Sequence, residues 1–484
     1  MIFFSFCLNV WAQGHFKLNQ LKVNGEIRSL KVVDLDDDGF KELIVLYTLQ
    51  KNNHKQKYLS IFSPDRSNGY SQNRQFKMPI PSSYLIIDVG KLPDKKNTCL
   101  AFLTTSSLLC YYFKAKSLSA SEKILNISNP VIQAPSSEYI ISYKLIYDWN
   151  EDGKNEIFIL QLGSGLIFYY LDRGWTSQRI NLPVDVSFFS FGLAGLFPHS
   201  EINVNYQTPK LFLEDWDGDG TKELLAICNE QLWVYKRNSK NFYSSQPIAR
   251  LSFPLPTPDK KAQRQQFNIL IADLDNDGFA DALTNLQQGG IFNQKAQLCI
   301  YSGKNLYRHK LKPKRSWEYN AWIIGPFIRD LDNDGDVDLI IPIVEAGFFT
   351  TARVLITGYV PLQWNYYFNH QHHFNDLPDY TDRIDLHLDL SEGKFTTGFP
   401  NVFADFNGDG VADLVYSKSE DELIIAIKDK SGARKYKETV SVASVGLPIT
   451  KDFNQDGLAD IFIYYPQSPE HRGEINVLVN KGGW

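Results

Sequence analysis

The chain has 484 residues, of which 43% are hydrophobic and 14% aromatic, a composition that can bury large apolar cores. No run reaches the ~18 apolar residues of a membrane span, and no cysteine–histidine spacing is typical of zinc. The formal net charge is −5 at pH 7. We expect neither a membrane span nor a nucleic-acid partner.

The chain opens on an apolar segment. Residues 1–12 read MIFFSFCLNVWA, which is typical of the apolar part of a secretory signal peptide, with cleavage after Ala12. The basic residues that usually come first are missing, because the first lysine is Lys17. An apolar N-terminus without a targeting role is the alternative. We expect a secreted, periplasmic or cell-surface protein, with residues 13–484 forming one domain.

A nine-residue phrase then recurs seven times. It carries an oxygen side chain at positions 1, 3, 5 and 9 and glycine at position 6. Asp, Asn and Gly are common turn formers, so a single copy is compatible with an ordinary turn. Seven copies in phase, each followed by an apolar run, indicate a repeated ligand site. The copies are DLDDDGFKE (34–42), DWNEDGKNE (148–156), DWDGDGTKE (215–223), DLDNDGFAD (273–281), DLDNDGDVD (330–338), DFNGDGVAD (405–413) and DFNQDGLAD (452–460).

The phrase matches the needs of calcium, which takes six to eight hard oxygens. Short Asp and Asn side chains at positions 1, 3 and 5 point inward, position 7 gives its backbone carbonyl, and position 9 closes the loop. Glycine at position 6 suits a turn with positive φ. Magnesium fits less well because it keeps several waters, and position 12 lacks the glutamate of an EF-hand.

We therefore predict up to seven structural Ca²⁺ sites. The predicted ligands are Asp34, Asp148, Asp215, Asp273, Asp330, Asp405 and Asp452 at position 1; Asp36, Asn150, Asp217, Asp275, Asp332, Asn407 and Asn454 at position 3; Asp38, Asp152, Asp219, Asp277, Asp334, Asp409 and Asp456 at position 5; Phe40, Lys154, Thr221, Phe279, Asp336, Val411 and Leu458 at position 7; and Glu42, Glu156, Glu223, Asp281, Asp338, Asp413 and Asp460 at position 9.

Short β-branched and aromatic runs flank the loops at strand length, and no stretch shows a helical period of 3.6. The wide gap between the first two copies holds a worn copy at Asp88–Asp94, with strands before and after it, which we do not expect to bind metal. Counting it gives eight units of about four strands, the signature of an all-β, eight-bladed β-propeller. Seven blades is the alternative if the worn unit is an insertion. An orphan strand, Phe16 to Val23, is predicted to complete the last blade.

The loops and their strand–loop–strand setting resemble the FG-GAP/VCBS repeats of secreted bacterial proteins and integrin α-subunit propellers, over roughly residues 16–484. The resemblance implies a calcium-stabilised propeller in adhesion, carbohydrate binding or, in some members, polysaccharide cleavage. The Phe-Gly opening and Gly-Ala-Pro tail of integrin repeats are absent. The chain is therefore more similar to the bacterial type, and integrin-like partners are not implied.

The longest interval between copies carries an aromatic and histidine-rich insert, Gln363–Phe374. Its side chains suit sugar stacking or a protein contact, and His370 and His372 would share one face of an extended strand, where they could meet a transition metal. The alternative is an outer strand with a packed loop. The predicted ligand surface comprises Trp364, Tyr366, Tyr367, His370, His372, His373 and Tyr380.

The seven loops hold 28 of the 55 Asp and Glu residues, and seven Ca²⁺ ions would change the formal charge from −5 to +9. A basic run at Arg308–Arg315 adds to this, so an anionic polysaccharide is one expected partner; solvated lysines without a partner are the alternative. Cys99 and Cys110 lie on consecutive predicted strands, where either a disulfide or two thiols would fit.

We interpret the chain as a secreted or cell-surface, calcium-binding propeller that binds polysaccharide or protein without catalysis. No nucleophile elbow, phosphate loop or zinc signature supports an enzyme, and the fold alone licenses no activity. A propeller-type polysaccharide lyase or hydrolase is an alternative, for which His373, Asp376, Tyr380 and Arg383 are the residues to test. A scaffold subunit of a surface complex is another.

Overall fold

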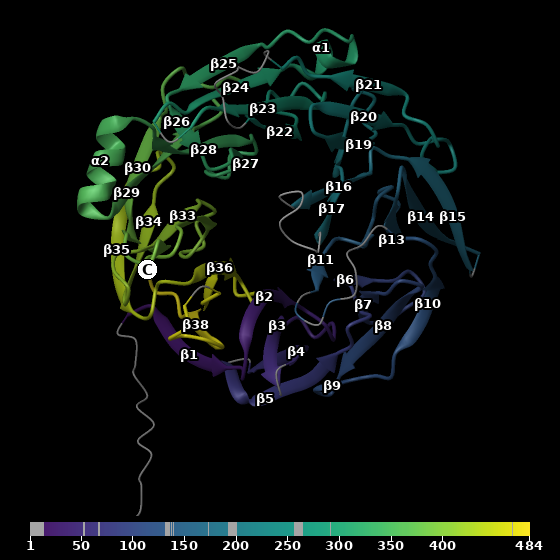
Figure 1. Cartoon of the computed structure of the whole chain (residues 1–484), viewed down its shortest axis with the longest axis horizontal. Helices are drawn as coiled ribbons and strands as arrows, with labels where there is room; N and C mark the ends of the chain where they lie inside the picture. The colour runs from purple at the N-terminus through teal and green to yellow at the C-terminus, as the bar shows by residue number, and fades with distance from the viewer. Residues whose placement is uncertain are drawn as a thin grey trace, which may run out of the picture.

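The computed structural model of the protein describes residues 14–51, 54–65, 68–130, 136, 138, 140–172, 174–191, 201–255, 265–290, 292–466 and 468–484. Eight β-sheets follow one another around a central axis and close into a ring (Figure 1). The predicted all-β, eight-bladed propeller is confirmed, and the seven-bladed alternative is excluded. The predicted signal peptide, residues 1–12, lies outside the described residues.

The blades are numbered in chain order, with the innermost strand first. Blade 1 contains β2 (Glu26–Val33), β3 (Glu42–Lys51), β4 (His54–Asp65) and β5 (Gly69–Ile80). Blade 2 contains β6 (Ile86–Lys91), β7 (Thr98–Leu103), β8 (Ser107–Lys114) and β10 (Glu122–Asn126), with short β9 (Ser117–Leu118) and β11 (Ile141–Ser142). Blade 3 contains β12 (Ile146–Tyr147), β13 (Glu156–Gln161), β14 (Ser164–Leu171) and β15 (Gly174–Asn181), and blade 4 contains β18 (Lys210–Glu214), β19 (Glu223–Cys228), β20 (Gln231–Tyr235) and β21 (Ala249–Ser252).

Blades 5 to 8 complete the ring. Blade 5 contains β22 (Gln265–Ala272), β23 (Asp281–Gln288), β24 (Lys295–Tyr301) and β25 (Arg315–Tyr319). Blade 6 contains β26 (Ala321–Ile323) and β27 (Phe327–Arg329) as a divided inner strand, then β28 (Asp338–Glu345), β29 (Tyr359–Tyr367) and β30 (Tyr380–Asp389), with short β31 (Lys394–Phe395). Blade 7 contains β32 (Asn401–Ala404), β33 (Asp413–Ser417), β34 (Glu422–Lys428) and β35 (Arg434–Ser441), and blade 8 contains β36 (Leu447–Lys451), β37 (Asp460–Tyr464), β38 (Glu474–Asn480) and β1 (Phe16–Lys22).

The second strand of each blade explains why the chain packs this way. β7 and β13 are buried at every residue, because both faces of a blade press on neighbouring blades and the strand must be apolar on both sides. The described core divides into eight clusters, and each cluster combines residues of two adjacent blades. The hydrophobic core is therefore a ring of inter-blade interfaces.

The ring closes with strands from both ends of the chain. β1 pairs antiparallel with β38 from Phe16↔Asn480 to Lys22↔Glu474. It occupies the outermost place in blade 8, whose strand order is β1-β38-β37-β36. The predicted closure by the orphan strand is confirmed, and it covers the edge of β38 that blade 8 would otherwise leave open.

Blade 2 corrects the predicted position of the worn copy. Asp88 does not begin a loop, because β6 continues through it to Lys91 and pairs there with Thr98 of β7. The hairpin turn is residues 92–97, too short for the nine-residue phrase. Asp88 is instead buried and accepts the backbone N–H groups of Leu145 and Ile146 in blade 3. The blade was predicted correctly, and its loop was misplaced.

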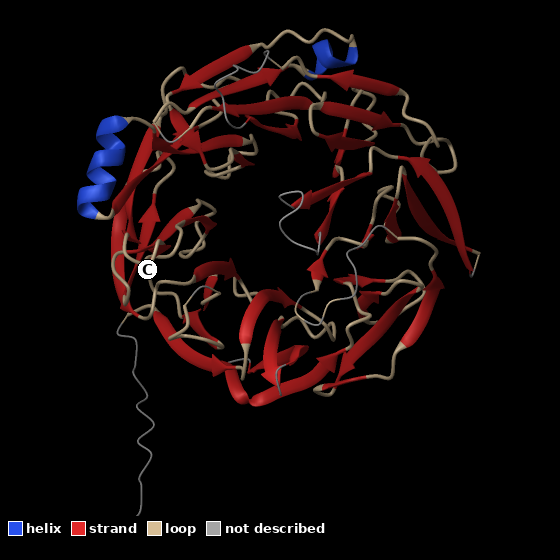
Figure 2. Cartoon of the chain, viewed as in Figure 1, coloured by secondary structure: helices blue, strands red, loops and turns tan. Residues whose placement is uncertain are grey.

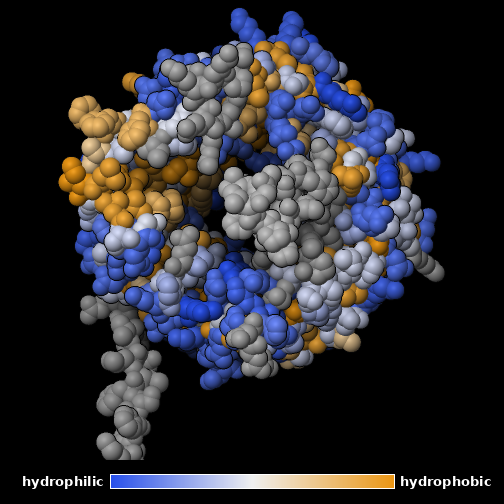
Figure 3. Space-filling model, viewed as in Figure 1, coloured by the Kyte–Doolittle hydropathy of each residue, from blue (hydrophilic) through white to orange (hydrophobic). Residues whose placement is uncertain are grey.

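The structure contains two helices that the periodicity did not predict, α1 (Gly303–Tyr307) and α2 (Phe348–Thr357), both at the outer side of the ring (Figure 2). In α2 the side chains of Phe348, Phe349, Leu355 and Ile356 are 64–87% exposed, and apolar surface gathers over this part of the rim (Figure 3). The apolar side of α2 faces outward and not toward the core. The core-facing pattern that usually predicts a helix is therefore missing. Within the described chain, neither helix has the length and apolar content of a membrane span.

A separate hairpin, β16 (Asp185–Phe191) with β17 (Glu201–Gln207), lies between blades 3 and 4. Its strand pairing is described and its side chains are not. The packing of this phenylalanine-rich insert therefore lies outside the described residues.

Blade 2 carries a disulfide where it lacks the nine-residue phrase. Cys99 on β7 is bonded to Cys110 on β8, and both residues are fully buried. The disulfide alternative is confirmed. The bond ties the second and third strands of the blade together and restricts the unfolded chain.

We expect the double substitution Cys99→Ala/Cys110→Ala to lower the free energy of unfolding by about 2–3 kcal/mol, because the bond closes a loop with a sequence separation of 11. Urea denaturation with and without dithiothreitol measures the effect. Dithiothreitol should bring the wild type to the level of the variant and leave the variant unchanged. Equal stability of the two oxidised proteins contradicts this role.

Candidate metal centre

The seven phrases form seven loops of one kind, here called metal loops and numbered by blade: 1, 3, 4, 5, 6, 7 and 8. Each joins the innermost strand of its blade to the second strand. Blades repeat around an axis with their strands in the same direction, so all seven loops lie on one face of the ring. Five loops bring three carboxylates within 4.8 Å of one another: Asp34, Asp36 and Glu42; Asp148, Asp152 and Glu156; Asp215, Asp217 and Glu223; Asp273, Asp275 and Asp281; and Asp330, Asp332 and Asp338.

The same hydrogen bonds shape every metal loop. The position-1 aspartate accepts the N–H of the position-6 glycine at 2.7–3.1 Å. The position-5 aspartate accepts the N–H of position 7 at 2.8–3.0 Å. The glycines have φ of 81–94°, as predicted. Position 4 is also left-handed, with φ of 48–79°, which the sequence analysis missed although Asn and Gly hold four of the seven places.

Positions 2 and 9 fix each loop to its blade. Position 2, which the sequence analysis did not consider, is a large apolar residue that is at most 7% exposed, such as Phe406 or Trp216. The position-9 carboxylate accepts the N–H of position 2 at 2.8–3.1 Å. In loops 5 to 8 its second oxygen accepts a backbone N–H at or just beyond the end of the third strand, from Gly303, Asn369, Lys428 or Asn480.

The inner oxygens of the loops have acceptor capacity that the protein does not use. One position-3 side-chain oxygen is buried without a hydrogen-bond partner in Asp36, Asp217, Asp275, Asp332 and Asn454. A buried acceptor without a partner costs about 1–3 kcal/mol, and a hard cation would satisfy it. The donor set, all oxygen and mostly carboxylate, therefore fits a hard divalent cation and matches the preference of calcium.

Because several loop carboxyl groups are buried, their ionised form is unfavourable unless a cation is bound. Desolvation raises the pKa of Glu42 to about 8 and that of Glu156 to about 8. It raises the pKa of Asp281 and of Asp460 to about 7. Neighbouring loop carboxylates add to the shift. Each raised pKa means that the charged form is disfavoured, which a bound cation would reverse.

In the metal-free protein we expect stability to fall as pH rises from about 5 to 8. A carboxyl whose pKa is near 7 or 8 when folded, and near 4 when unfolded, takes up a proton on folding between those values. Raising the pH through this window therefore favours the unfolded chain. Melting temperatures recorded in EDTA from pH 5 to 8 measure the trend, and a rising melting temperature contradicts it.

Lysine side chains form ion pairs with the carboxylates of loops 4 and 5. The Lys236 ammonium contacts Asp217 and lies 2.8 Å from Asp219 in loop 4. In loop 5, Lys314 lies 2.6 Å from Asp275 and Lys304 lies 3.1 Å from Asp277. All three lysines lie outside the nine-residue phrase, so its pattern does not predict them. They supply part of the positive charge that these loops require.

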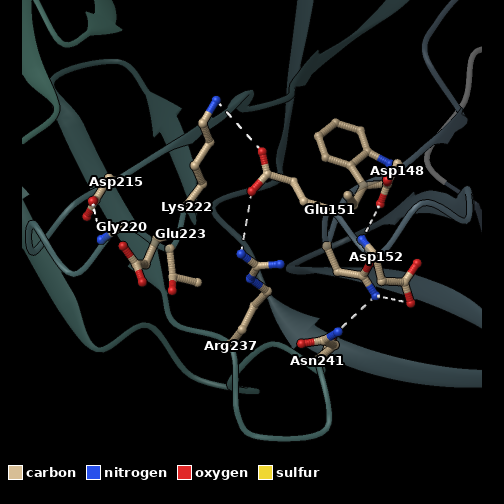
Figure 4. Close-up of polar contacts among 12 residues, drawn as sticks. Asp148, Glu151, Asp152, Asp215, Gly220, Lys222, Glu223, Arg237 and Asn241 are labelled. Atoms are coloured by element: carbon tan, nitrogen blue, oxygen red, sulfur yellow. Dashed lines mark hydrogen bonds and ion pairs between the residues drawn. The ribbon is translucent and has the colours of Figure 1, made fainter. Parts of the chain in front are cut away.

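Neighbouring loops also contact one another (Figure 4). The Glu151 carboxylate of loop 3 lies 3.7 Å from Lys222 of loop 4 and 3.5 Å from Arg237 of blade 4. The backbone continues the connection, because Ala280 of loop 5 donates its N–H to the Asp215 carbonyl of loop 4 at 2.7 Å. Position 4 and position 8 thus link one loop to the next.

Comparison with known proteins identifies the repeats. Residues 215–284 match the model of the FG-GAP-like repeat family, and this segment contains metal loops 4 and 5 in adjacent blades of the closed ring. The protein is an FG-GAP-repeat β-propeller. The FG-GAP propeller is also similar to a solved structure of an Agrocybe aegerita lectin that recognises non-reducing terminal N-acetylglucosamine. The two sequences are 12% identical, the match covers 98% of this chain and 99% of that chain, and the TM-score is 0.40. No curated protein matches it.

The predicted ligand surface of the FG-GAP propeller is only partly exposed. Trp364, Tyr366 and Tyr367 are at most 5% exposed. β29 is the third strand of blade 6 and packs between neighbouring blades. These three residues are therefore core residues, and their inclusion in a ligand surface was wrong. Tyr380 is half-buried and donates a hydrogen bond to Asp382.

The histidines lie in a turn after β29. Gln371 and His372 have φ of 51° and 71°, so His370 and His372 are not on an extended strand and the argument that they share a face fails. His370 contacts Asp379 at 3.1 Å, and His373 contacts the Gln371 carbonyl at 3.0 Å. His370, His372 and His373 are exposed, and their role in ligand binding stays a prediction.

The residues proposed for an enzyme do not share one set of contacts. Asp376 pairs with Arg315 of blade 5, while Tyr380 contacts Asp382. Arg383 is exposed on β30. In the basic run, Lys314 and Arg315 are committed to Asp275 and Asp376, while Arg308, Lys310 and Lys312 are exposed.

Proposed function

We propose that the FG-GAP propeller is a secreted or cell-surface binding module that calcium stabilises, and that it holds polysaccharide or a surface protein without catalysing a reaction. Seven loops with one hydrogen-bond frame, on one face of a closed ring, support this proposal. The buried, unpartnered position-3 oxygens in five of these loops are the observation that carries it. Metal at these points fixes a broad, rigid face.

The charge of the calcium-loaded protein supports a polymer ligand. Ions in all seven loops would bring the formal charge to +9, and Arg308, Lys310 and Lys312 are exposed. Positive charge attracts acidic polymers over a distance and weakens with salt. Among the described residues, every group of three or more carboxylates close enough to share an ion lies in a metal loop. These acids serve the cation in this proposal.

A glycan array that includes acidic and neutral polysaccharides, probed with and without EDTA, tests the proposal. We expect binding in calcium and its loss in EDTA. Acidic ligands should also release the protein as salt is raised. Release of unsaturated products from the bound polysaccharide, seen as ultraviolet absorbance, would replace the binding module with a lyase. Equal binding in calcium and EDTA contradicts the role of calcium.

A further inference from the structure

A cavity of about 680 Å³ lies between blades 7 and 8, next to the point where the ring closes. This volume falls within the range of about 300–1,000 Å³ for small-molecule sites. Blade 7 contributes Tyr436 and Asn407, and the two ends of the chain contribute His15 and Trp484. None of these residues belongs to the predicted ligand surface in blade 6.

The walls of the cavity are held in place by the closure itself. Lys481 donates its N–H to the His15 carbonyl at 2.7 Å, and Asn480 donates its side-chain amide to the Phe406 carbonyl at 2.8 Å. The His15 ring lies 2.7 Å from a Glu438 oxygen through Nδ1 and 3.0 Å from the Gly483 carbonyl through Nε2. A pre-formed wall lowers the ordering cost of binding.

Aromatic rings form one side of the cavity. His15 stacks on Trp484 with centroids 4.1 Å apart and an interplanar angle of 15°. Tyr436 stands edge-on to both rings at 5.8 Å and is 48% exposed. Ile427 and Leu458 extend this apolar side. A ligand with one apolar face would lie against these residues, as flat rings with C–H groups do on aromatic side chains.

The polar part of the lining carries no formal charge from Lys, Arg, Asp or Glu among the described residues. It consists of the backbone of Gly482 and Gly483, whose φ of 66° and 90° suit glycine. The Asn407 side chain borders the cavity but is engaged within loop 7, where it donates to Asp409 at 2.9 Å and accepts the Asp409 N–H at 3.2 Å. Amide and backbone groups donate and accept hydrogen bonds without attracting ions. Such a lining disfavours phosphate or carboxylate ligands and suits neutral hydroxyl groups.

We propose that this cavity, the closure pocket, binds a neutral hexopyranose unit, with its apolar face on the ring cluster of Tyr436, His15 and Trp484 and its hydroxyls toward the Gly482–Gly483 backbone. The inference rests on the proposed binding function and deepens it by giving it a place and a ligand class. The net positive charge of the calcium-loaded protein attracts acidic polymers over a distance, whereas the closure pocket selects an uncharged sugar.

Saturation-transfer NMR and isothermal titration on the calcium-loaded full chain test the proposal, with the methyl glycosides of glucose, galactose and mannose as probes. We expect at least one glycoside to bind, and Tyr436→Ala to weaken that binding at least tenfold. Tyr307→Ala is the matched control, because Tyr307 is 46% exposed, lies in blade 5 and does not line the closure pocket. It should bind like the wild type.

Equal affinity of Tyr436→Ala and the wild type overturns the closure pocket, and so does a failure of every glycoside to bind. The melting temperature of each variant must match the wild type within a few degrees, and His15→Ala provides a second variant if Tyr436→Ala does not fold. Binding on the glycan array with no glycoside binding rejects the closure pocket and leaves the binding module standing. A blank array and blank titrations reject both.

Discussion

Removal of divalent cations with EDTA is expected to lower the melting temperature of the FG-GAP propeller by roughly 10 °C or more, since each site at 100 times its Kd contributes about 2.7 kcal/mol. Without metal, three carboxylates, one of them buried, stay within 4.8 Å of one another in five loops. They either repel one another or take up protons. Scanning calorimetry in EDTA, followed by excess Ca²⁺, measures the loss and its recovery. Mg²⁺ should restore less, because it gives up its waters reluctantly.

Single substitutions should act on one loop at a time. Asp275→Ala removes the position-3 carboxylate of loop 5, which has a buried, unpartnered oxygen, and should lower the calcium stoichiometry by about one site. Asp94→Ala is the matched control in blade 2, because its turn lacks the nine-residue phrase, and it should leave the stoichiometry unchanged. An unchanged melting temperature in EDTA contradicts a stabilising role of metal in the loops.

Asp382→Asn is expected to lower the free energy of unfolding by about 3–5 kcal/mol, because it leaves buried cations without their counter-charge. The Asp382 carboxylate lies 2.9 Å from the Lys428 ammonium and 2.6 Å from the Arg434 guanidinium, which belong to blade 7. The Lys428 side chain is 2% exposed. Burial lowers the pKa of Lys428, and Asp382 raises it again. The variant therefore loses the main group that keeps this lysine charged.

Further variants test whether the loss of stability comes from the buried ion pairs of Asp382. Asp385→Asn lies on the same strand, but Asp385 is exposed and 3.8 Å from Arg353, so its loss should change stability by at most ~0.5 kcal/mol. Adding Lys428→Met to Asp382→Asn should recover part of the loss, because it removes a buried charge. Urea denaturation of the wild type, Asp382→Asn, Lys428→Met and Asp382→Asn/Lys428→Met gives a double-mutant cycle, with Asp385→Asn as the control. Equal losses for Asp382→Asn and Asp385→Asn contradict the argument.

Repetition made much of the fold predictable. A short phrase that recurs in phase marks seven of the eight blades, and continuous apolar runs such as β13 identify strands that are buried on both faces. The worn blade shows the limit. Asp88 looked like a first position, yet β6 continues through it, because strand pairing depends on the partner strand and not on one acidic residue.

The ligand surface was harder to predict for the same reason. Aromatic residues on β29 suggested exposure, but whether Trp364 faces solvent or a neighbouring blade depends on blade packing that the local sequence does not contain. The Asp382–Lys428–Arg434 cluster joins two blades, and the closure pocket joins the two ends of the chain. Each depends on residues far apart in sequence, so no local pattern marks them.

The closure of the ring has a consequence for the order of folding. β1 is made first among the strands, and its partner β38 is made last. At ~5–20 residues per second of synthesis, β1 waits roughly half a minute or more for that partner. Until then it is an unpaired amphipathic strand, prone to pair with another chain. Circular permutants that open between other blades would join these two strands directly, and they should refold faster and aggregate less.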